Sequence, residues 1–343
     1  MKVFFQHTIQ VVLVLLALVL LFFLWSTYTA YTPANVEVLS QSKKANVYQV
    51  DTLCILSWNI GYGGLDSAMD FFMDGGEKTR QTKEQTERNL TAIAATLAQY
   101  THMDFVFLQE VDVKSRRSYR TDELSELARM LNNHVAYFAL NYKAAFVPIP
   151  LTSPLGRVES GIATFTRYVP SEVTRFSYPS QESWPVNIFN LKRCFLTLRY
   201  KLSSGKELVL VNTHNSAFDN GEQRRVEMEY LKQYLLEQDS CYVVVGGDWN
   251  HTPPFYPECA GTDYFKPAPI DSTFMPSGWT WNYDATTPSN RFMNEPYSEG
   301  RTQVTILDFF LCSPNVRVLN VQTLDLGFNH SDHNPVTITL VLE

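Results

Sequence analysis

Short apolar runs alternate with stretches of helical periodicity along most of the chain. Residues 53–58 form an apolar run that nearby glycines end, residues 80–100 place apolar side chains at helical spacing, and residues 105–108 are apolar again. This order predicts a strand, a helix and a second strand. Further strands are predicted at 162–166, 194–200, 207–212, 242–245, 304–311, 316–323 and 336–342, with helices at 122–131 and 221–236. Many strands with few helices predict an α/β sandwich, in which helices cover two packed sheets.

The N-terminal segment departs from this pattern. Residues 9–25 are almost entirely apolar, and no acidic residue precedes Glu37. The run is about the minimum length for a membrane-spanning helix and is longer than most signal-peptide cores. We therefore expect a retained transmembrane anchor, with a cleaved signal peptide as the alternative.

The chain then divides into four parts. We expect a short cytoplasmic N-terminus at 1–8, the anchor or uncleaved signal at 9–25, a polar linker at 26–50 and one catalytic domain at 51–343. Lys2 lies on the N-terminal side of the anchor, so the positive-inside rule predicts a single-pass protein of the cell membrane with its catalytic domain outside the cytoplasm.

Composition narrows the range of partners and of stabilising chemistry. The net charge of −7 argues against an extended basic surface for nucleic acid. Five cysteines, an odd number with no Cys-x-x-Cys spacing, argue against a disulfide framework. Asn-x-Ser/Thr sequons begin at Asn89, Asn250 and Asn329, and the last two lie in or beside predicted active-site motifs. A glycan there would block the site, so we expect a host that does not glycosylate them, a bacterium.

Polar residues follow the apolar strands with unusual regularity, at the positions where a sheet presents side chains to a cleft. Any one of them taken alone fits a turn, a cap or a solvated charge. Carboxylate and amide oxygens are the ligands that Mg²⁺ or Mn²⁺ prefers, and histidine transfers protons near neutral pH. Together these residues predict metal-assisted phosphoryl chemistry. They are Asn59, Glu110, His214, Asp248, Asn250, Asp308, Asp332 and His333.

Six short motifs resemble those of the endonuclease/exonuclease/phosphatase superfamily, which includes pancreatic deoxyribonuclease, apurinic endonucleases, neutral sphingomyelinases and inositol polyphosphate 5-phosphatases. Their order and spacing cover about residues 51 to 343. The resemblance implies a four-layer, deoxyribonuclease-like α/β sandwich preceded here by one transmembrane helix. The motifs are Trp58-Asn59, Leu108-Gln-Glu-Val111, Asn212-Thr-His214, Gly247-Asp-Trp-Asn250, Leu307-Asp308 and Ser331-Asp-His333.

For the metal, the resemblance implies one or two Mg²⁺ or Mn²⁺ ions. Glu110 is then the principal metal carboxylate, Asn59 orients it or a bound water, and Asp332 is a second metal or orienting ligand. The resemblance also implies that Asp248 contacts a second metal ion.

For the reaction, the resemblance implies that Asp248 and Asn250 position the nucleophile and hold the phosphoryl group. Asp308 would orient His333, the base for the attacking water. His214 would bind phosphate or protonate the leaving group.

Departures from the family pattern touch the expected cleft wall. Asn215 stands where many members have Leu and Trp249 where Phe is usual, so we expect both to contact substrate, together with Arg224 as a phosphate clamp. Gly61 stands where apurinic endonucleases carry a carboxylate, which argues against that activity.

Three functions stay open. The first is a phosphodiesterase on a phospholipid or sphingolipid headgroup, with the apolar segment 144–151 as a loop that dips into lipid or as a buried connection. The second is an extracellular nuclease on DNA or RNA, supported only by short arginine clusters. The third is an inactive binding protein on the same fold. We expect the membrane as a partner, through the N-terminal helix, and no protein partner.

Overall fold

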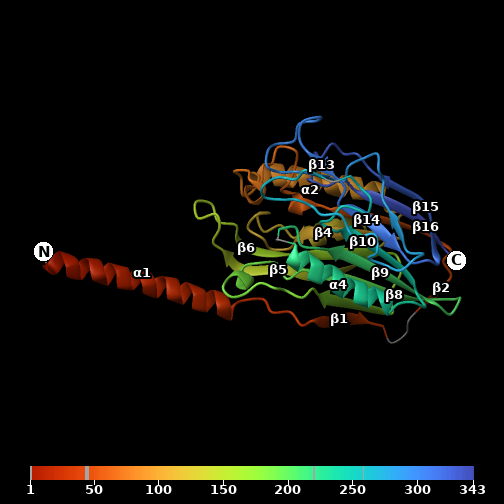
Figure 1. The fold of residues 1–343 in the computed structure, drawn as a ribbon, viewed down its shortest axis with the longest axis horizontal. Helices are drawn as coiled ribbons and strands as arrows, with labels where there is room; N and C mark the ends of the chain where they lie inside the picture. The colour runs from red at the N-terminus through yellow and green to blue at the C-terminus, as the bar shows by residue number, and fades with distance from the viewer. Residues whose placement is uncertain (1, 43–45, 219–220, 258) are drawn as a thin grey trace.

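The fold is an α/β sandwich of two mixed sheets preceded by a long apolar helix, as the sequence predicts (Figure 1). The computed structural model describes residues 2–42, 46–218, 221–257 and 259–343. The helices are α1 (Lys2–Tyr28), α2 (Lys83–Gln99), α3 (Glu123–Met130) and α4 (Glu222–Leu236), with short 3₁₀ turns at Gly61–Gly63, Phe72–Asp74 and Val186–Ile188.

One sheet has eight strands in the order β1-β7-β8-β9-β10-β14-β11, with β2 beside β8. These strands are β1 (Val36–Gln41), β2 (Val47–Tyr48), β7 (Glu172–Ser177), β8 (Cys194–Leu202), β9 (Glu207–His214), β10 (Tyr242–Asp248), β11 (Thr280–Asn282) and β14 (Asp308–Cys312).

The other sheet has six strands in the order β15-β16-β3-β4-β6-β5. They are β3 (Thr52–Asn59), β4 (Phe105–Asp112), β5 (Val135–Val147), β6 (Gly156–Thr166), β15 (Val316–Thr323) and β16 (Val336–Leu342). A separate pair, β12 (Asn290–Arg291) and β13 (Val304–Thr305), lies beside the two main sheets.

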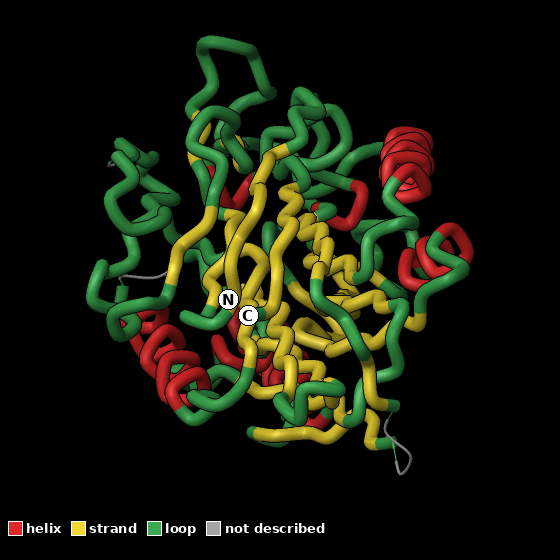
Figure 2. The backbone as a smooth tube through the Cα atoms, turned by 90° about the vertical axis from the view of Figure 1, so that its right-hand side faces the viewer, coloured by secondary structure: helices red, strands yellow, loops and turns green. Residues whose placement is uncertain are grey.

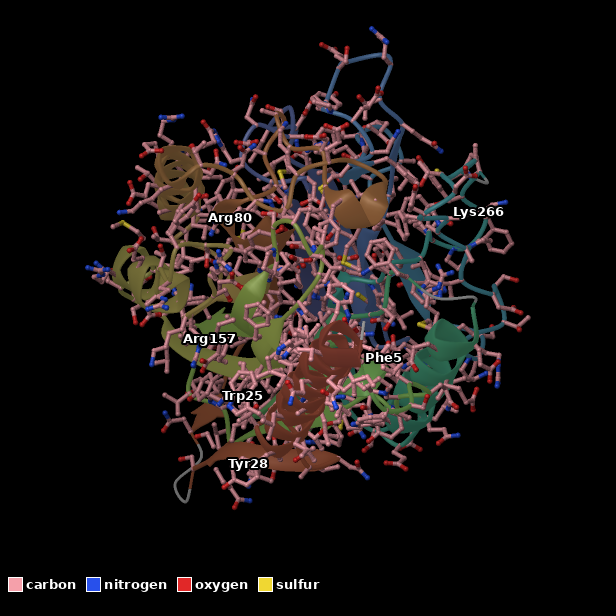
Figure 3. The ribbon with its side chains drawn as sticks, turned by 90° about the vertical axis from the view of Figure 1, so that its left-hand side faces the viewer. Phe5, Trp25, Tyr28, Arg80, Arg157 and Lys266 are labelled. Carbon is pink, nitrogen blue, oxygen red and sulfur yellow. The ribbon has the colours of Figure 1, made fainter. Side chains whose placement is uncertain are left out.

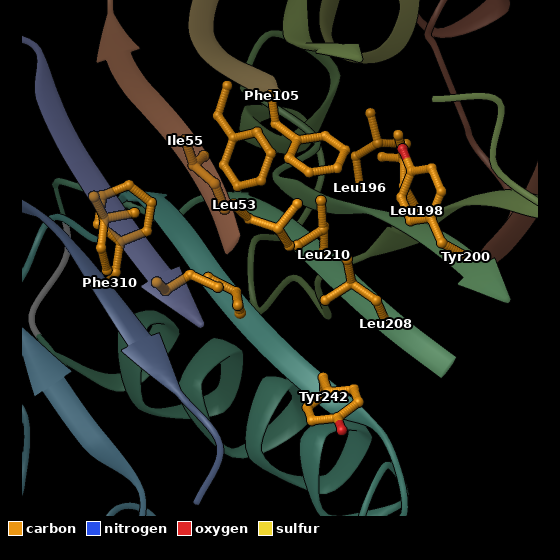
Figure 4. Close-up of a cluster of buried hydrophobic side chains, with 14 of the residues drawn as sticks. Leu53, Ile55, Phe105, Leu196, Leu198, Tyr200, Leu208, Leu210, Tyr242 and Phe310 are labelled. Carbon is orange, nitrogen blue, oxygen red and sulfur yellow. The ribbon is translucent and has the colours of Figure 1, made fainter. Parts of the chain in front are cut away.

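Four layers result from the way the apolar faces are covered. Figure 2 shows the strands between helices on opposite sides of the body. Leucine, isoleucine and aromatic side chains of both sheets form the central core, for which Figure 4 shows Ile55, Phe105, Leu210 and Phe310 converging. The outer face of the six-stranded sheet packs on α2 and α3, and that of the eight-stranded sheet on α4. Burying both faces of each sheet is what makes its strands read as continuous apolar runs.

Several elements differ from the sequence prediction. The strand predicted at 304–311 is two strands, β13 and β14. The Leu307 and Asp308 amides at this break donate hydrogen bonds to the Ser289 hydroxyl, which interrupts the pairing of one strand with the next. Strands β5 and β7 were not predicted. The segment 26–50, expected to be a linker, contributes β1 and β2 to the edge of the eight-stranded sheet. All five cysteines are free in the structure.

The apolar N-terminal helix is longer than the predicted 9–25. Residues Val3–Tyr28 form one helix, whose most apolar 18-residue window has a mean hydropathy of 2.8, and the helix is long enough to cross a membrane, a property that a signal sequence shares. Its residues 3–21 are all exposed. Its C-terminal turns touch the body, where Phe22 stacks on Phe189 with ring centroids 5.9 Å apart.

Candidate active site

Strand directions bring the predicted polar residues to one edge of the sandwich. The strands β3 and β4 are parallel, as are β9 and β10, so Asn59, Glu110, His214 and Asp248 lie at or near carboxyl ends. The antiparallel neighbour β14 begins at this same edge, with Asp308 paired to Asp248. The segment before β16 also arrives here, because β16 runs antiparallel to β3. Ligand sites form at such edges because the strand ends leave side chains unpaired.

The end of β10 requires a glycine. Gly247 has φ 141°, and a Cβ there would lie 2.0 Å from the Thr213 carbonyl oxygen, so only glycine lets β9 and β10 approach this closely. The next residue, Asp248, accepts a hydrogen bond from the Asn250 amide at 3.0 Å. Asn250, in a left-handed conformation with φ 51°, donates its side-chain nitrogen to the Asn215 carbonyl at 2.8 Å. This network holds both side chains at the cleft.

Asp248 is the centre of the polar group. Its Oδ2 lies 3.0 Å from Asn59 Nδ2, 3.4 Å from His214 Nε2 and 3.8 Å from His333 Nε2. Burial raises the pKa of Asp248 to about 6, although the charge of His333 opposes that rise. The carboxyl group is therefore poised to gain or lose a proton near neutral pH.

His333 and Asp308 form a hydrogen-bonded dyad. His333 Nδ1 lies 2.7 Å from Asp308 Oδ2, which also accepts a hydrogen bond from the Ser289 hydroxyl at 2.8 Å. The Trp58 indole donates to the His333 carbonyl at 2.9 Å and fixes the backbone. Because Nδ1 donates to the carboxylate, Nε2 is the nitrogen that faces the cleft.

The charge of His333 follows from its neighbours. Burial opposes the imidazolium, but the carboxylates of Asp308, Asp332 and Asp248 outweigh burial and raise the pKa of His333 well above its usual value. The Asn290 amide nitrogen lies 3.0 Å from Nε2. Donation of a hydrogen bond by this nitrogen requires a neutral His333 ring.

The pKa of His214 is shifted in the opposite direction. Burial, with the charges of Arg193 and His333 adding to it, lowers the pKa of His214 well below its usual value. Its Nε2 lies 3.4 Å from Asp248 Oδ2 and 3.8 Å from Glu110 Oε1. A neutral ring in this position donates a hydrogen bond to an anion but holds no extra proton to transfer.

The carboxylates at the edge fit a divalent cation. Burial, with the nearby charge of Glu110 adding to it, raises the pKa of Asp332 to about 6. Asn59 Nδ2 lies 3.4 Å from Glu110 Oε1 and so ties that carboxylate to Asp248. Oxygen donors of this kind suit Mg²⁺ or Mn²⁺. Asp248, Asp308 and His333 also lie within 4.8 Å of one another, but Asp308 and His333 already bind each other, so Glu110 and Asp332 are the better ligands.

Asp74 is a cleft residue that sequence reasoning missed. It lines the same cleft as Glu110 and Asp332, and its Oδ2 is buried without a hydrogen-bond partner among the described residues. Burial raises its pKa to about 7, with the charges of Asp332 and Glu110 adding to the effect. An unpaired buried carboxyl group beside two others strengthens the fit to a cation. Asp74 follows no apolar strand, so no sequence pattern marked it.

Two arginines also line the cleft: Arg117, which belongs to one of the short arginine clusters noted in the sequence, and Arg193, which sequence reasoning missed. Arg117 lies in the cleft, where its Nε and Nη2 donate hydrogen bonds to Asp112 and its guanidinium lies 3.6 Å from the centre of the Tyr62 ring. Arg193 also lines the cleft, and its Nη1 is buried without a partner among the described residues. The position of Arg193, directly before β8, is the one signal that the sequence offered.

The three predicted substrate contacts are corrected by the structure. Trp249 is fully buried and stacks on Phe309, with ring centroids 5.3 Å apart, in the core beneath α4. Asn215 is buried and bonded to the Thr213 hydroxyl at 2.6 Å. Adjacent residues of an extended chain face opposite sides, so the neighbours of Asp248 and His214 point away from the cleft. Arg224 lies on α4 and donates to the Lys266 carbonyl, beside a separate hollow.

The cleft has a polar floor and an apolar upper part. It encloses about 1160 Å³ of space between protein atoms, counting its open mouth. The polar side chains that line it include Glu110, His214, Asp248, Asp332 and His333. The walls carry apolar side chains from distant segments, among them Phe71, Ile149, Phe189, Phe218 and Phe292.

The sequence motifs and the fold together identify the family. The family model for the endonuclease/exonuclease/phosphatase family matches residues 56–333. The chain therefore belongs to this family, whose members are generally metal-dependent phosphoesterases and nucleases. No curated protein matches the chain.

Solved structures share the fold at low sequence identity. An endonuclease/exonuclease/phosphatase protein from Beutenbergia cavernae is 17% identical, with a TM-score of 0.60 over 85% of this chain and 72% of its own. The D. rerio protein TDP2, complexed with a single-strand DNA product, is 17% identical, with a TM-score of 0.52 over 84% of this chain and 98% of its own. ANGEL2, a 2′,3′-cyclic phosphatase, is 14% identical, with a TM-score of 0.56 over 91% of this chain and 99% of its own. These neighbours support the architecture.

Proposed function

We propose that the protein is a divalent-metal-dependent phosphodiesterase that acts outside the cytoplasm, at the membrane surface, on a phospholipid or sphingolipid headgroup. The observation that carries the phosphoesterase assignment is the Asp308–His333 dyad, whose cleft-facing Nε2 lies 3.8 Å from Asp248 Oδ2 and 3.7 Å from Asp332 Oδ2. An orienting carboxylate, an imidazole and a set of cation-binding oxygens are the parts that water-driven phosphoester hydrolysis needs.

Each residue takes a role that its geometry supports. One or two bound Mg²⁺ or Mn²⁺ ions, held by Glu110 and Asp332 with Asn59 beside them, would neutralise charge on the phosphoryl group. Asp308 fixes the tautomer of His333, and His333 Nε2 accepts the proton of the attacking water.

Two more residues position the reacting groups in this proposal. His214, neutral because of its burial, donates a hydrogen bond to a phosphoryl oxygen. Asn250, fixed by the Asp248 carboxyl group and the Asn215 carbonyl, orients the nucleophile. Protonation of the leaving group falls to a residue other than His214, since a neutral ring has no extra proton to give.

The lipid preference rests on the cleft walls and on charge. Apolar side chains surround the polar floor, and the net charge of −7 gives nucleic acid little long-range attraction. A surface nuclease is the alternative, since the D. rerio neighbour was solved with single-strand DNA.

A substrate panel tests the proposal. The full-length protein in phospholipid nanodiscs with Mg²⁺ or Mn²⁺ should hydrolyse sphingomyelin or an inositol phospholipid, and His333→Ala should abolish this activity. Hydrolysis of plasmid DNA or RNA in place of lipid would establish the nuclease instead. No turnover of any phosphoester, with metal bound, would leave only the inactive binding protein.

A further inference from the structure

The end of α1 is joined to the body by an aromatic contact. Phe22 stacks on Phe189 and meets Phe146 edge-on at 6.3 Å, while Phe23 lies 5.7 Å from Trp184. The Trp184 indole donates a hydrogen bond to the Thr27 hydroxyl at 3.0 Å. Ser26, in the same turn, is buried. Through this joint the end of the apolar helix contacts the domain directly, ahead of residues 29–35 that lead into β1.

The length of the helix sets the depth of this joint in a bilayer. Residues 3–21 are all exposed, and at 1.5 Å per residue they span about 28 Å, close to the hydrocarbon thickness of about 30 Å. The residues that follow contact the body or carry aromatic rings, with Trp25 and Tyr28 exposed at the base of the helix (Figure 3). Tryptophan and tyrosine favour the membrane interface, so this turn falls at headgroup level.

An exposed apolar surface adjoins the joint. We call it the rim and define it as Ile149, Leu151, Trp184 and Val186, whose exposed fractions are 46%, 87%, 58% and 53%. Residues 144–156 and 183–191, which carry the rim, include no charged residue. Figure 1 shows the loop between β5 and β6, which holds Ile149 and Leu151, on the side of the body from which α1 leaves.

The rim is continuous with the catalytic cleft. Ile149 lines the cleft and belongs to the rim, and Phe189 lines the cleft and stacks on Phe22. Apolar side chains therefore extend from the end of α1 to the catalytic cleft. An exposed apolar patch of this kind marks a binding surface when its partner is apolar.

We infer that the rim is a bilayer-docking surface, and that α1 and the rim together hold the mouth of the cleft at the headgroup layer of the membrane that α1 spans. The occupant is a phospholipid bilayer, because the only apolar partner that the joint places beside the rim is the membrane around α1. Docking rests on retention of α1. Entry of a lipid headgroup from the bilayer into the cleft rests in addition on the proposed function.

Fluorescent labelling tests the docking directly. Leu151→Cys carries an environment-sensitive fluorophore in full-length protein reconstituted in phosphatidylcholine nanodiscs, and the wild type, treated identically, gives the background from Cys54 and Cys259. Leu319→Cys, on β15 and 50% exposed, is the matched control. We expect lipids with a quencher near the headgroup to remove most of the fluorescence at position 151 and little at 319, and aqueous iodide to do the reverse.

Equal quenching of both positions by iodide would overturn docking. So would recovery of a mature chain that begins after Tyr28, because the helix that sets the depth would be lost. A bilayer signal at position 151 without any lipid hydrolysis would leave docking intact and refute the lipid substrate.

A kinetic experiment adds a second readout. Leu151→Glu and Val186→Glu lie outside the cleft lining, so hydrolysis of a small water-soluble phosphodiester should be unchanged. Hydrolysis of a lipid in nanodiscs should fall about tenfold or more for each, because each loses a buried apolar side chain at the bilayer. Leu319→Glu should change neither rate. An equal fall for all three variants, or no fall for the rim variants, would contradict the inference.

Discussion

His333 Nδ1 lies 2.7 Å from Asp308 Oδ2, although Asp308 begins β14 in one sheet and His333 precedes β16 in the other. The two sheets therefore meet at this hydrogen bond, and the proposed base is oriented by a residue from the opposite layer. The tautomer of His333 depends on how the sheets pack.

Asp308→Asn should lower kcat by about 10²- to 10⁴-fold with little change in KM, because the amide no longer selects the productive tautomer. His333→Ala should cost at least as much, and the double variant little more than His333→Ala alone. Steady-state kinetics on folded protein measures this. If Asp308 only supports the strand, the melting temperature would fall without a matching loss in kcat, and the two changes would add.

Glu110→Gln should weaken Mg²⁺ or Mn²⁺ binding while the fold persists, because the amide keeps the size and loses the charge that holds a hard cation. Glu229→Gln, an exposed change on α4, is the control. Calorimetric titration with each metal compares the affinities. The same affinity in wild type and Glu110→Gln would remove this residue from the metal site.

The metal-free protein should lose stability as the pH rises from 5 to 8. The folded pKa values of Asp248 and Asp332 are about 6 and that of Asp74 about 7, all above the ordinary value of 3.8. The folded state therefore binds these protons more tightly than the unfolded chain, so their contribution is present at low pH and lost as pH passes through 6 to 7. Thermal melts in chelator over this range measure the loss.

Two comparisons sharpen that experiment. Added Mg²⁺ should raise the melting temperature more at pH 8 than at pH 5, because the cation replaces the missing protons. Asp74→Asn should flatten the metal-free pH profile and raise stability at pH 8. Because the lowered pKa of His214 acts in the opposite direction below pH 6.5, the comparison of wild type with Asp74→Asn decides the outcome. Identical metal-free pH profiles for the two proteins would contradict the burial of the Asp74 charge.

Native protein should fractionate with membranes and be cleaved by protease added to intact cells, since we expect α1 to stay in place with the domain outside the cytoplasm. As the control for cell integrity, a cytoplasmic marker protein should stay uncleaved in the same cells. A soluble mature form that starts near Ala30 would identify α1 as a signal peptide instead.

The residues that sequence alone located are those tied to a local pattern. Asn59, His214 and Asp248 end apolar strands, and this regular placement, together with the resemblance to the family motifs, was enough to group them. The strands around them were predicted for the same reason. Strand β5 was not, because Asn141 and Lys143 interrupt its apolar run.

Other site residues reach the cleft only through tertiary packing. Asp74 and Asn290 lie in segments without periodicity, and their positions follow from loops that fold over the edge. Trp249 and Asn215 show the converse. Each adjoins a catalytic residue in the sequence, yet the alternation of an extended chain turns its side chain into the core.

The aromatic joint between α1 and the body has a consequence for where such a protein works. If α1 spans the membrane, the height of the cleft above the lipid is fixed by the helix and cannot be adjusted by a tether. A thicker bilayer would draw Phe22 and Trp184 inward, and a thinner one would lift the rim out of contact. Catalysis on lipid would then depend on acyl-chain length even though no acyl chain takes part in the chemistry, and hydrophobic mismatch would sort the enzyme among membranes.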